Sequence, residues 1–203
     1  MRVFIVLPAF NEADNLPEIL EALRRLGQET YNLKVEVVLV DDCSEDETID
    51  VVQKHAVGLG LEVLRNSVHQ GLAGTLLRGI KAAAARADDH DVIVSMDADN
   101  THLPGQIRQL IRGIQEGRDV MIASRYRNGA VIRGVPFKRR LLSYGASWAG
   151  RLLYPIVGVR DYSCGYRAYS ATLLKRALKV YGESLCPEMG LSLIHISEPT
   201  RLL

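Results

Sequence analysis

Carboxylates stand at positions in the sequence where short apolar runs end. Asp97 and Asp99 follow one such run, Asp41 and Asp42 follow another, and Glu12 lies just after a third. Residues two positions apart in an extended segment point to the same face, so the side chains of Asp97 and Asp99 can reach one cation. Hard cations such as Mg²⁺ take oxygen ligands from one or two carboxylates and fill their other positions with water and phosphate. We therefore predict that Asp97 and Asp99 hold Mg²⁺ or Mn²⁺, which connects them to a diphosphate group.

The strands and helices that would position these carboxylates can be predicted from the spacing of apolar residues, which alternates between two patterns along the chain. Apolar runs rich in β-branched residues occupy residues 3–7, 35–40, 61–64, 92–96 and 120–123. Apolar residues with helical spacing lie between them, at 16–23, 49–57, 76–80 and 107–114, and a strand at 165–169 and a helix at 171–181 are predicted later. Continuous apolar runs are typical of parallel strands buried on both faces. The alternation therefore predicts a single α/β domain with a Rossmann-like, mostly parallel sheet flanked by helices.

Ligands of a parallel α/β sheet bind outside the carboxyl ends of its strands. The predicted strand ends carry the carboxylates and, after the fifth apolar run, Arg125. Carboxylates that share one edge repel each other unless a cation lies among them. Each motif alone also has a purely structural interpretation, since Asp41-Asp42 before Ser44 is typical of a turn and a helix cap. Their joint occurrence at successive strand ends favours a binding site.

The charge of the chain is divided by position. Residues 1–119 carry 12 Lys and Arg against 20 Asp and Glu, whereas residues 120–160 carry eight basic residues and no acidic one. The resulting charges of −8 and +8 predict different partners for the two segments. An acid-free basic stretch suits a phosphate group or an anionic membrane surface. The pI of 7.8 and the acidic first segment argue against nucleic acid as a partner.

Composition also predicts a compartment and a domain boundary. The 203 residues contain no apolar run of 18, and the chain opens on a strand-like segment without the layout of a signal peptide. Three cysteines without CxxC spacing favour a reducing cytoplasm over a disulfide framework or a zinc site. Residues 191–203 (LSLIHISEPTRLL) continue neither period. We expect them to be a non-native tail on a C-terminally truncated domain of residues 1–190.

Seven sequence motifs, taken together in order and spacing, resemble a known family. PAFNE (8–12), VDDCSEDET (40–48), QGLAGTLLRG (70–79), MDADNTHLP (96–104) and SRY (124–126) resemble the family 2 glycosyltransferases of the GT-A fold. KRRLLSYGA (138–146) and DYSCGYRAY (161–169) narrow the resemblance to the dolichyl- and polyprenyl-phosphate sugar synthases. The resemblance covers about residues 2–190 and implies a GT-A catalytic domain over residues 1–190.

The resemblance implies a role for each matching position. The positions implied to bind the nucleotide sugar are Pro8, Phe10, Glu12, Val40, Asp42, Asp97, Ala98, Asp99 and Arg125. Asp97 and Asp99 form the DxD motif, which contacts the diphosphate and the metal. Arg125 and Arg139 bind phosphate near the reaction centre and on the acceptor loop, so the implied catalytic set is Asp99, Arg125 and Arg139. The implied reaction is inverting transfer of a sugar from a donor of the GDP-mannose or UDP-glucose type to a polyprenyl or dolichyl phosphate.

A phosphate acceptor agrees with the chemistry of the basic stretch. A lipid phosphate is already ionised near neutral pH, so it needs positioning by guanidinium groups, whereas a hydroxyl acceptor needs a general base. A lipid acceptor also implies peripheral contact with an anionic membrane. We expect a cytoplasmic protein that contacts the inner face of the membrane, where anionic lipids attract basic residues.

The sequence departs from the family pattern at three places and leaves two alternatives. Thr101 stands where some relatives have a glutamine ligand, His69-Gln70 replace a common asparagine, and Trp148 lacks the preceding arginine of the QxxRW motif. One alternative is a family 2 transferase with a glycan or protein hydroxyl as acceptor, in which Asp161 would be the base. The other is a non-enzymatic, receiver-like signalling module, since such modules also place acidic residues at strand ends.

Overall fold

A computed structural model of the chain describes residues 1–123, 164–182 and 185. Its strands are β1 (Arg2–Ala9), β2 (Lys34–Asp41), β3 (Gly60–Arg65), β4 (Val92–Ser95), β5 (Val120–Ile122) and β6 (Arg167–Ser170). Its helices are α1 (Leu16–Glu29), α2 (Thr48–His55), α3 (Gly71–Arg86), α4 (Ile107–Gln115) and α6 (Ala171–Tyr181), and a 3₁₀ turn, η1 (Pro104–Gln106), precedes α4. Each strand and helix that the sequence predicts within these ranges is present.

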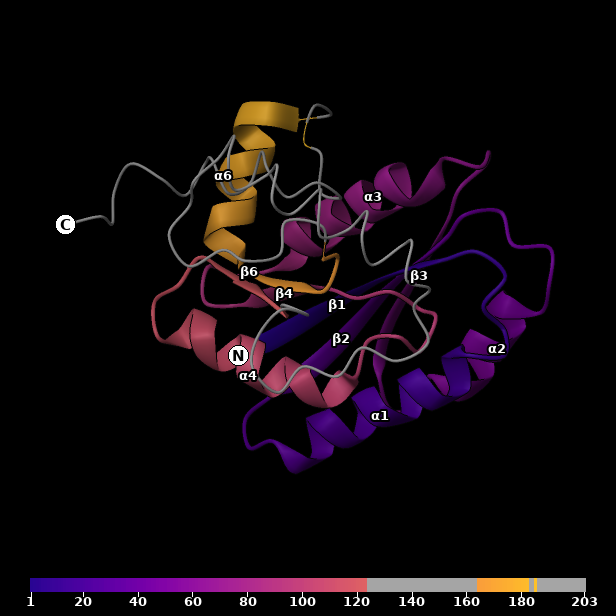
Figure 1. The fold of residues 1–203 in the computed structure, drawn as a ribbon, viewed down its shortest axis with the longest axis horizontal. Coiled ribbons are helices and arrows are strands. Elements are labelled where there is room, and N and C mark those ends of the chain that lie inside the picture. Colours follow the sequence, from indigo (N-terminus) through magenta and orange to yellow (C-terminus); the bar gives the residue numbers. More distant parts are fainter. Residues whose placement is uncertain (124–163, 183–184, 186–203) are drawn as a thin grey trace, which may run out of the picture.

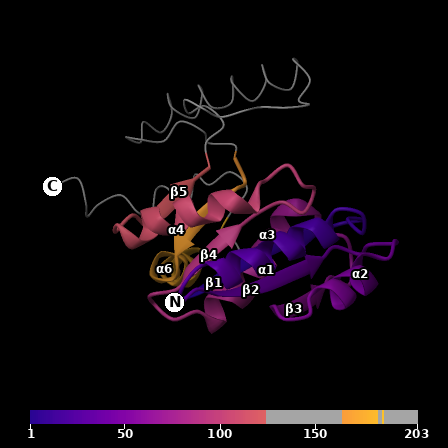
Figure 2. The same ribbon diagram turned by 90° about the horizontal axis from the view of Figure 1, so that it is seen from below.

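In the described part of the chain the strands form one sheet in the order β3-β2-β1-β4-β6-β5 (Figure 1; β5 is labelled in Figure 2). β1 pairs in parallel with β2 and β4, and β2 pairs in parallel with β3. β6 runs antiparallel to both of its neighbours, β4 and β5. The predicted α/β architecture with a mostly parallel sheet is therefore confirmed, and the late strand β6 lies inside the sheet.

Helices cover both faces of the sheet, with α3 and α6 on one side and α1, α2 and α4 on the other (Figure 1). Val3, Ile5 and Leu7 of β1 pack with α1, α2 and α4, whereas Phe4 and Val6 pack with α3 and α6. All five side chains have 0% exposure, which explains why β1 is an uninterrupted apolar run rather than an alternating one. None of the helices in the described ranges has the length and apolar character needed to cross a bilayer.

α3 lies very close to the sheet because of a glycine. A Cβ atom at Gly79 would overlap Cγ1 of Val6 and lie 3.0 Å from Cγ2 of Val40. The helix begins at Gly71, earlier than its apolar spacing predicts, and Gly71 has a φ of 70°, a conformation that glycine adopts without strain. Gly79 thus sets the distance between α3 and the sheet, and Gly71 sets where α3 begins. The first turn of α3 borders the edge formed by the carboxyl ends of the parallel strands.

The loops at the carboxyl edge contain left-handed residues that are not glycine. Asn11 (φ 57°), Cys43 (φ 68°) and Asn100 (φ 59°) follow the ends of β1, β2 and β4 in turn. Asparagine tolerates this conformation better than most residues, whereas cysteine does not. Sparsely populated backbone conformations concentrate at functional sites, where the surrounding structure holds them in place. The strain therefore marks the edge where the sequence places the carboxylates.

Candidate active site

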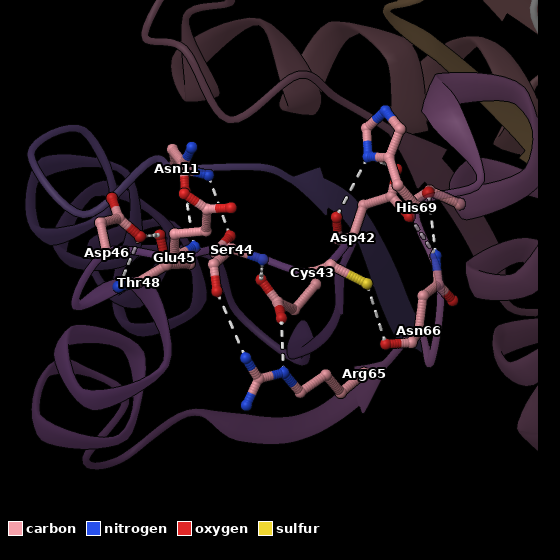
Figure 3. A network of polar contacts seen from close by, with 12 residues as sticks. Asn11, Asp42, Cys43, Ser44, Glu45, Asp46, Thr48, Arg65, Asn66 and His69 are labelled. Atoms are coloured by element: carbon pink, nitrogen blue, oxygen red, sulfur yellow. Dashed lines mark hydrogen bonds and ion pairs between the residues drawn. The ribbon is translucent and has the colours of Figure 1, made fainter.

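The loop after β1 is fastened to the loop after β2 by hydrogen bonds (Figure 3). The backbone N–H of Asn11 donates to Oγ of Ser44 at 2.9 Å, and Oδ1 of Asn11 accepts from the N–H of Glu45 at 2.8 Å. The N–H of Glu12 donates to Oγ1 of Thr48 at 2.9 Å. The two loops therefore form one unit, and Phe10 and Glu12 are held in fixed positions relative to β2.

Asp42 connects the end of β2 to the start of α3. Its Oδ1 accepts from Nδ2 of Asn66 at 2.6 Å and from the N–H of Gln70 at 2.8 Å. Its Oδ2 accepts from the N–H of Gly71 at 2.8 Å and lies 3.0 Å from Nδ1 of His69. Gln70 and Gly71 open α3, so the carboxylate satisfies N–H groups that a helix leaves unpaired and faces the positive end of its dipole.

The surroundings of Asp42 keep its carboxylate ionised. Burial by itself raises the pKa of Asp42, but the hydrogen bonds from Asn66, Gln70 and Gly71 and the nearby His69 outweigh burial and lower the pKa below its ordinary value. Only 3% of the residue is exposed. Both carboxylate oxygens are thus engaged by the protein, and Asp42 shapes the edge by holding the segment from Asn66 to Gly71.

An exposed aromatic pair lies beside Asp42. The rings of Phe10 and His69 have centroids 4.9 Å apart and planes inclined by 58°. Phe10, which follows the end of β1, is 47% exposed, whereas Phe4 within β1 is fully buried. Nδ1 of His69 lies 3.3 Å from the backbone oxygen of Asp42, which fixes the imidazole over the end of β2. The pair offers a surface on which a planar ring can stack.

The DxD segment follows β4 and is shaped by its own side chains. Oδ1 of Asp99 accepts from both the N–H (3.0 Å) and Oγ1 (2.5 Å) of Thr101, and Asp99 is exposed. The N–H of Asp97 donates to Nδ1 of His102 at 3.0 Å. These bonds close the turn and leave Oδ2 of Asp99 with no hydrogen bond from the described residues. Thr101 therefore orients Asp99, in the position where some relatives have a glutamine ligand.

The carboxylates from three strand ends come together at this edge. Burial raises the pKa of Glu12, and the negative charges of Asp99, Asp46 and Asp97 raise it further, against a hydrogen bond from Asn15 that lowers it. That hydrogen bond runs from Nδ2 of Asn15 to Oε2 of Glu12 at 2.7 Å. The predicted gathering of Glu12, Asp97 and Asp99 is thus present in the structure.

The donor set fits a hard divalent cation. No lysine or arginine of the described residues forms an ion pair with Glu12 or Asp99, so their charge is not balanced by that part of the protein. Within the same ranges no three His, Cys, Asp or Glu side chains form a group that could hold an ion by themselves. Mg²⁺ and similar ions are commonly held by one or two carboxylates together with substrate phosphates. Asp97 and Asp99 suit that mode of binding.

Other predicted residues support the edge or lie elsewhere. Pro8 and Val40 are buried register partners in the β1–β2 pair, and Ala98 is 2% exposed between the two aspartates. Asp41, whose exposure is 0%, accepts from the N–H of Ser44 at 3.2 Å and lies 3.1 Å from Nε of Arg65, so its carboxylate is used within the fold. Arg125, Arg139, Trp148, Asp161 and the tail 191–203 lie outside the described residues.

Sequence reasoning missed the buried polar residues behind the edge. Asn66 is 3% exposed, and its Nδ2 also donates to Oγ1 of Thr75 at 3.1 Å. Its Oδ1 accepts from Arg78 at 2.6 Å, and Sγ of Cys43 donates to its backbone oxygen at 3.2 Å. The signal available in the sequence was an asparagine two residues after the predicted strand end at residue 64.

The chain belongs to glycosyl transferase family 2, whose model matches residues 4–178. Within that family it is 36% identical over 169 residues to the dolichol-phosphate mannosyltransferase of Pyrococcus furiosus, an alignment that covers 83% of this chain and 46% of the relative. It is 31% identical to the polyprenol monophosphomannose synthase of Mycolicibacterium smegmatis (86% and 64% covered) and 32% identical to the undecaprenyl-phosphate mannosyltransferase of Micrococcus luteus (86% and 69%). The chain thus spans about half to two thirds of these relatives.

Solved structures confirm the GT-A fold. TarS residues 1–349 of S. aureus superpose with a TM-score of 0.64 at 21% identity, over 96% of this chain and 55% of that one. Glucosyl-3-phosphoglycerate synthase of Mycobacterium tuberculosis, crystallised with Mn²⁺, UDP and glucosyl-3-phosphoglycerate, gives 0.60 at 23% identity over 85% and 57%. An antiparallel β6 between β4 and β5 also differs from the 2-1-3-4-5 order of receiver-like doubly wound sheets. Family and sheet order both argue against the signalling alternative.

Proposed function

We propose that this chain is a metal-dependent, inverting transferase that moves a sugar from a nucleoside diphosphate to a polyprenyl phosphate. The observation that carries the proposal is the meeting of Glu12, Asp97 and Asp99 at one sheet edge, where burial and then the charges of the two aspartates raise the pKa of Glu12. A cation-bound diphosphate is the ligand that such an edge needs. The names of the three relatives, all mannosyl or mannose-phosphate enzymes, favour mannose as the sugar.

The donor is assigned to the edge between β1, β2 and β4. Phe10, with His69, provides the surface for the base, and Asp42 holds the segment that carries His69. Glu12 is assigned to nucleotide binding as well, while the buried Pro8, Val40 and Ala98 shape the backbone beneath the nucleotide. This arrangement leaves the exposed carboxylate of Asp99 nearest to solvent, where a diphosphate enters.

Asp97 and Asp99 would hold Mg²⁺ or Mn²⁺ in this assignment. A bound divalent ion supplies Lewis-acid neutralisation of the charge that develops on the leaving diphosphate. Thr101 contributes by fixing Oδ1 of Asp99 through two hydrogen bonds, and no hydrogen bond from the described residues occupies the other oxygen. The Mn²⁺ and UDP in the glucosyl-3-phosphoglycerate synthase crystal support the same mode of donor binding.

The acceptor phosphate is assigned to Arg125 and Arg139. Guanidinium groups bind phosphate with two parallel hydrogen bonds, which orients one phosphate oxygen toward the anomeric carbon. That oxygen forms the new bond to the anomeric carbon as the bond to the diphosphate breaks, so the configuration inverts and a nucleoside diphosphate leaves. No general base is needed, because the phosphate is already ionised.

The domain and its location complete the proposal. We assign residues 1–190 to the transferase domain and residues 191–203 to a tail outside it. The acid-free segment 120–160, with a charge of +8, supports peripheral contact with the anionic inner face of the membrane. Each Lys or Arg near such a surface contributes about 1 kcal/mol of attraction.

Radiolabelled donors test the reaction directly. The full chain is incubated with GDP-mannose or UDP-glucose and Mn²⁺, and offered either polyprenyl phosphate or glycan acceptors. We expect label in the organic phase with polyprenyl phosphate, strongest with GDP-mannose and absent in EDTA. Label found only in the glycan would replace the lipid acceptor by a hydroxyl acceptor, and Asp161 would then be tested as its base.

A further inference from the structure

His102 and Tyr166 form a stacked pair directly behind the DxD segment. Their ring centroids lie 4.8 Å apart, and the ring planes are inclined by 19°. His102 follows β4 in the turn before η1, whereas Tyr166 comes from the segment that enters β6 and is 1% exposed. The two residues are distant in the sequence, and neither is among the donor-binding residues assigned above.

The imidazole of His102 faces Asp97 with both ring nitrogens. Nδ1 accepts from the N–H of Asp97 at 3.0 Å, and Nε2 lies 3.6 Å from Oδ2 of the same residue. Because Nδ1 is an acceptor, the hydrogen-bond pattern assigns the proton of the neutral ring to Nε2. The N–H at Nε2 is thereby turned toward the carboxylate of Asp97. The backbone and the side chain of Asp97 thus both face the same imidazole ring.

Tyr166 holds that ring from behind. Its hydroxyl donates to the backbone oxygen of Leu103 at 2.8 Å, and burial raises its pKa, so the phenol keeps its proton. The adjacent Gly165 accepts from Oγ of Ser95 at 2.7 Å, which ties the same segment to the last residue of β4. Tyr166 therefore holds His102 in two ways. Its ring stacks on the face of the imidazole, and its hydroxyl binds the backbone of Leu103, the residue after His102.

We propose that His102, held by Tyr166, is a positioning residue that orients Asp97 toward the cation-bound diphosphate of the donor. This inference rests on the proposed function. Groups that hydrogen-bond to a metal-binding carboxylate fix its orientation, and their loss typically lowers metal affinity or activity about 10- to 100-fold. A carboxylate that is already oriented also loses less side-chain entropy when the ligand binds.

Three substitutions at position 102 separate the two ring nitrogens. Asparagine can place a carbonyl oxygen near the position of Nδ1, glutamine places its amide near Nε2, and alanine supplies neither. Tyr166→Leu removes the stacked ring while leaving His102 in place, and the exposed His90→Asn serves as the matched control. Each variant is made in the full chain and compared by hydrogen exchange of the Asp97 amide without metal, and by calorimetry of GDP binding with and without Mn²⁺.

We expect the Asp97 amide to be protected in the wild type and in His102→Asn, and to exchange rapidly in His102→Ala and His102→Gln. Mn²⁺-dependent GDP affinity should fall about 10- to 100-fold in His102→Ala, in Tyr166→Leu and in His102→Asn, which lacks the donor near Nε2, and stay close to the wild-type value in His102→Gln. Affinity without Mn²⁺ should stay constant in all of them. Wild-type protection and affinity in His102→Ala would overturn the inference. Equal losses in all three His102 variants, together with lower unfolding temperatures, would also overturn it in favour of a general structural role.

Failure of the proposed function gives a different result. If the wild type binds GDP and UDP no better with Mn²⁺ than without it, the assignment of Asp97 and Asp99 to a metal fails. The exchange of the Asp97 amide in the metal-free variants still decides whether His102 orients that residue.

Discussion

Replacement of Asp42 by alanine tests the contact that connects the end of β2 to the start of α3. The substitution removes the acceptor of two backbone N–H groups at the start of α3, from Gln70 and Gly71, and of the side chain of Asn66. Hydrogen bonds to a charged group contribute about 1.5–3 kcal/mol each. Solvent can reach the first turn of α3 once the carboxylate is gone, so we count the two backbone bonds at the lower value and expect a loss of about 3 kcal/mol.

Urea denaturation at pH 7 measures the free energy of unfolding of Asp42→Ala against the wild type. A loss of about 3 kcal/mol corresponds to a decrease of about 6–12 °C in Tm for a chain of this size. Asp42→Asn keeps the volume but turns an amide NH₂ toward at least one donor, so it should also destabilise. The matched control is Asp50→Ala, an exposed acidic residue in the first turn of α2, which should cost less than about 1 kcal/mol.

The pH dependence gives an independent check with a fixed sign. The pKa of Asp42 lies below its ordinary value in the folded protein, so its stabilising contribution is complete above the unfolded value of about 3.9. That contribution disappears as the pH falls through the lower, folded value. The difference between wild type and Asp42→Ala should therefore be constant near neutral pH and shrink in acid. A loss below about 1 kcal/mol at pH 7, or a difference that grows in acid, would refute the reasoning.

Three further predictions concern the donor, the acceptor and the packing of α3. Asp99→Ala should abolish the Mn²⁺-dependent part of nucleotide affinity in calorimetry while leaving metal-independent binding intact; retained Mn²⁺ dependence would contradict the DxD assignment. Arg139→Ala should keep donor affinity but lower transfer to polyprenyl phosphate, as followed with radiolabelled donor, and equal losses of both would contradict its acceptor role. Gly79→Ala should cost about 1–3 kcal/mol in urea denaturation through overlap with Val6 and Val40, and an unchanged midpoint would show that α3 can shift outward.

Much of the fold was predictable because buried parallel strands have a distinctive pattern. The run at 3–7 is apolar at every position since β1 is buried on both faces, and the structure extends that strand to Arg2–Ala9. The position of β6 was not predictable, because the short strand predicted at 165–169 contains no information about which strands it pairs with. Its insertion between β4 and β5 depends on contacts between residues far apart in the sequence.

The candidate site was predictable in part for a similar reason. Strand ends located Glu12, Asp97 and Asp99 correctly at one edge, since parallel strands place their carboxyl ends together. The two members of the pair Asp41-Asp42 have different uses, however: one is buried against Arg65 and the other holds the start of α3. Alternation of side chains along a strand separates them, but which partner each meets is decided by the loops. Arg125 and Arg139 lie outside the described residues, so their assignment remains a prediction.

The antiparallel strand has a consequence for biosynthesis. While residues beyond 123 are still inside the ribosome, β4 has no neighbour on the side that β6 later occupies, and its apolar residues 92–94 belong to an unpaired edge strand. An unpaired edge strand of this kind readily forms β-sheet hydrogen bonds with another chain and so promotes aggregation. Tyr166 directly precedes β6 in the chain. When β6 pairs with β4, the nascent chain therefore covers this edge strand and also gains the ring that stacks on His102.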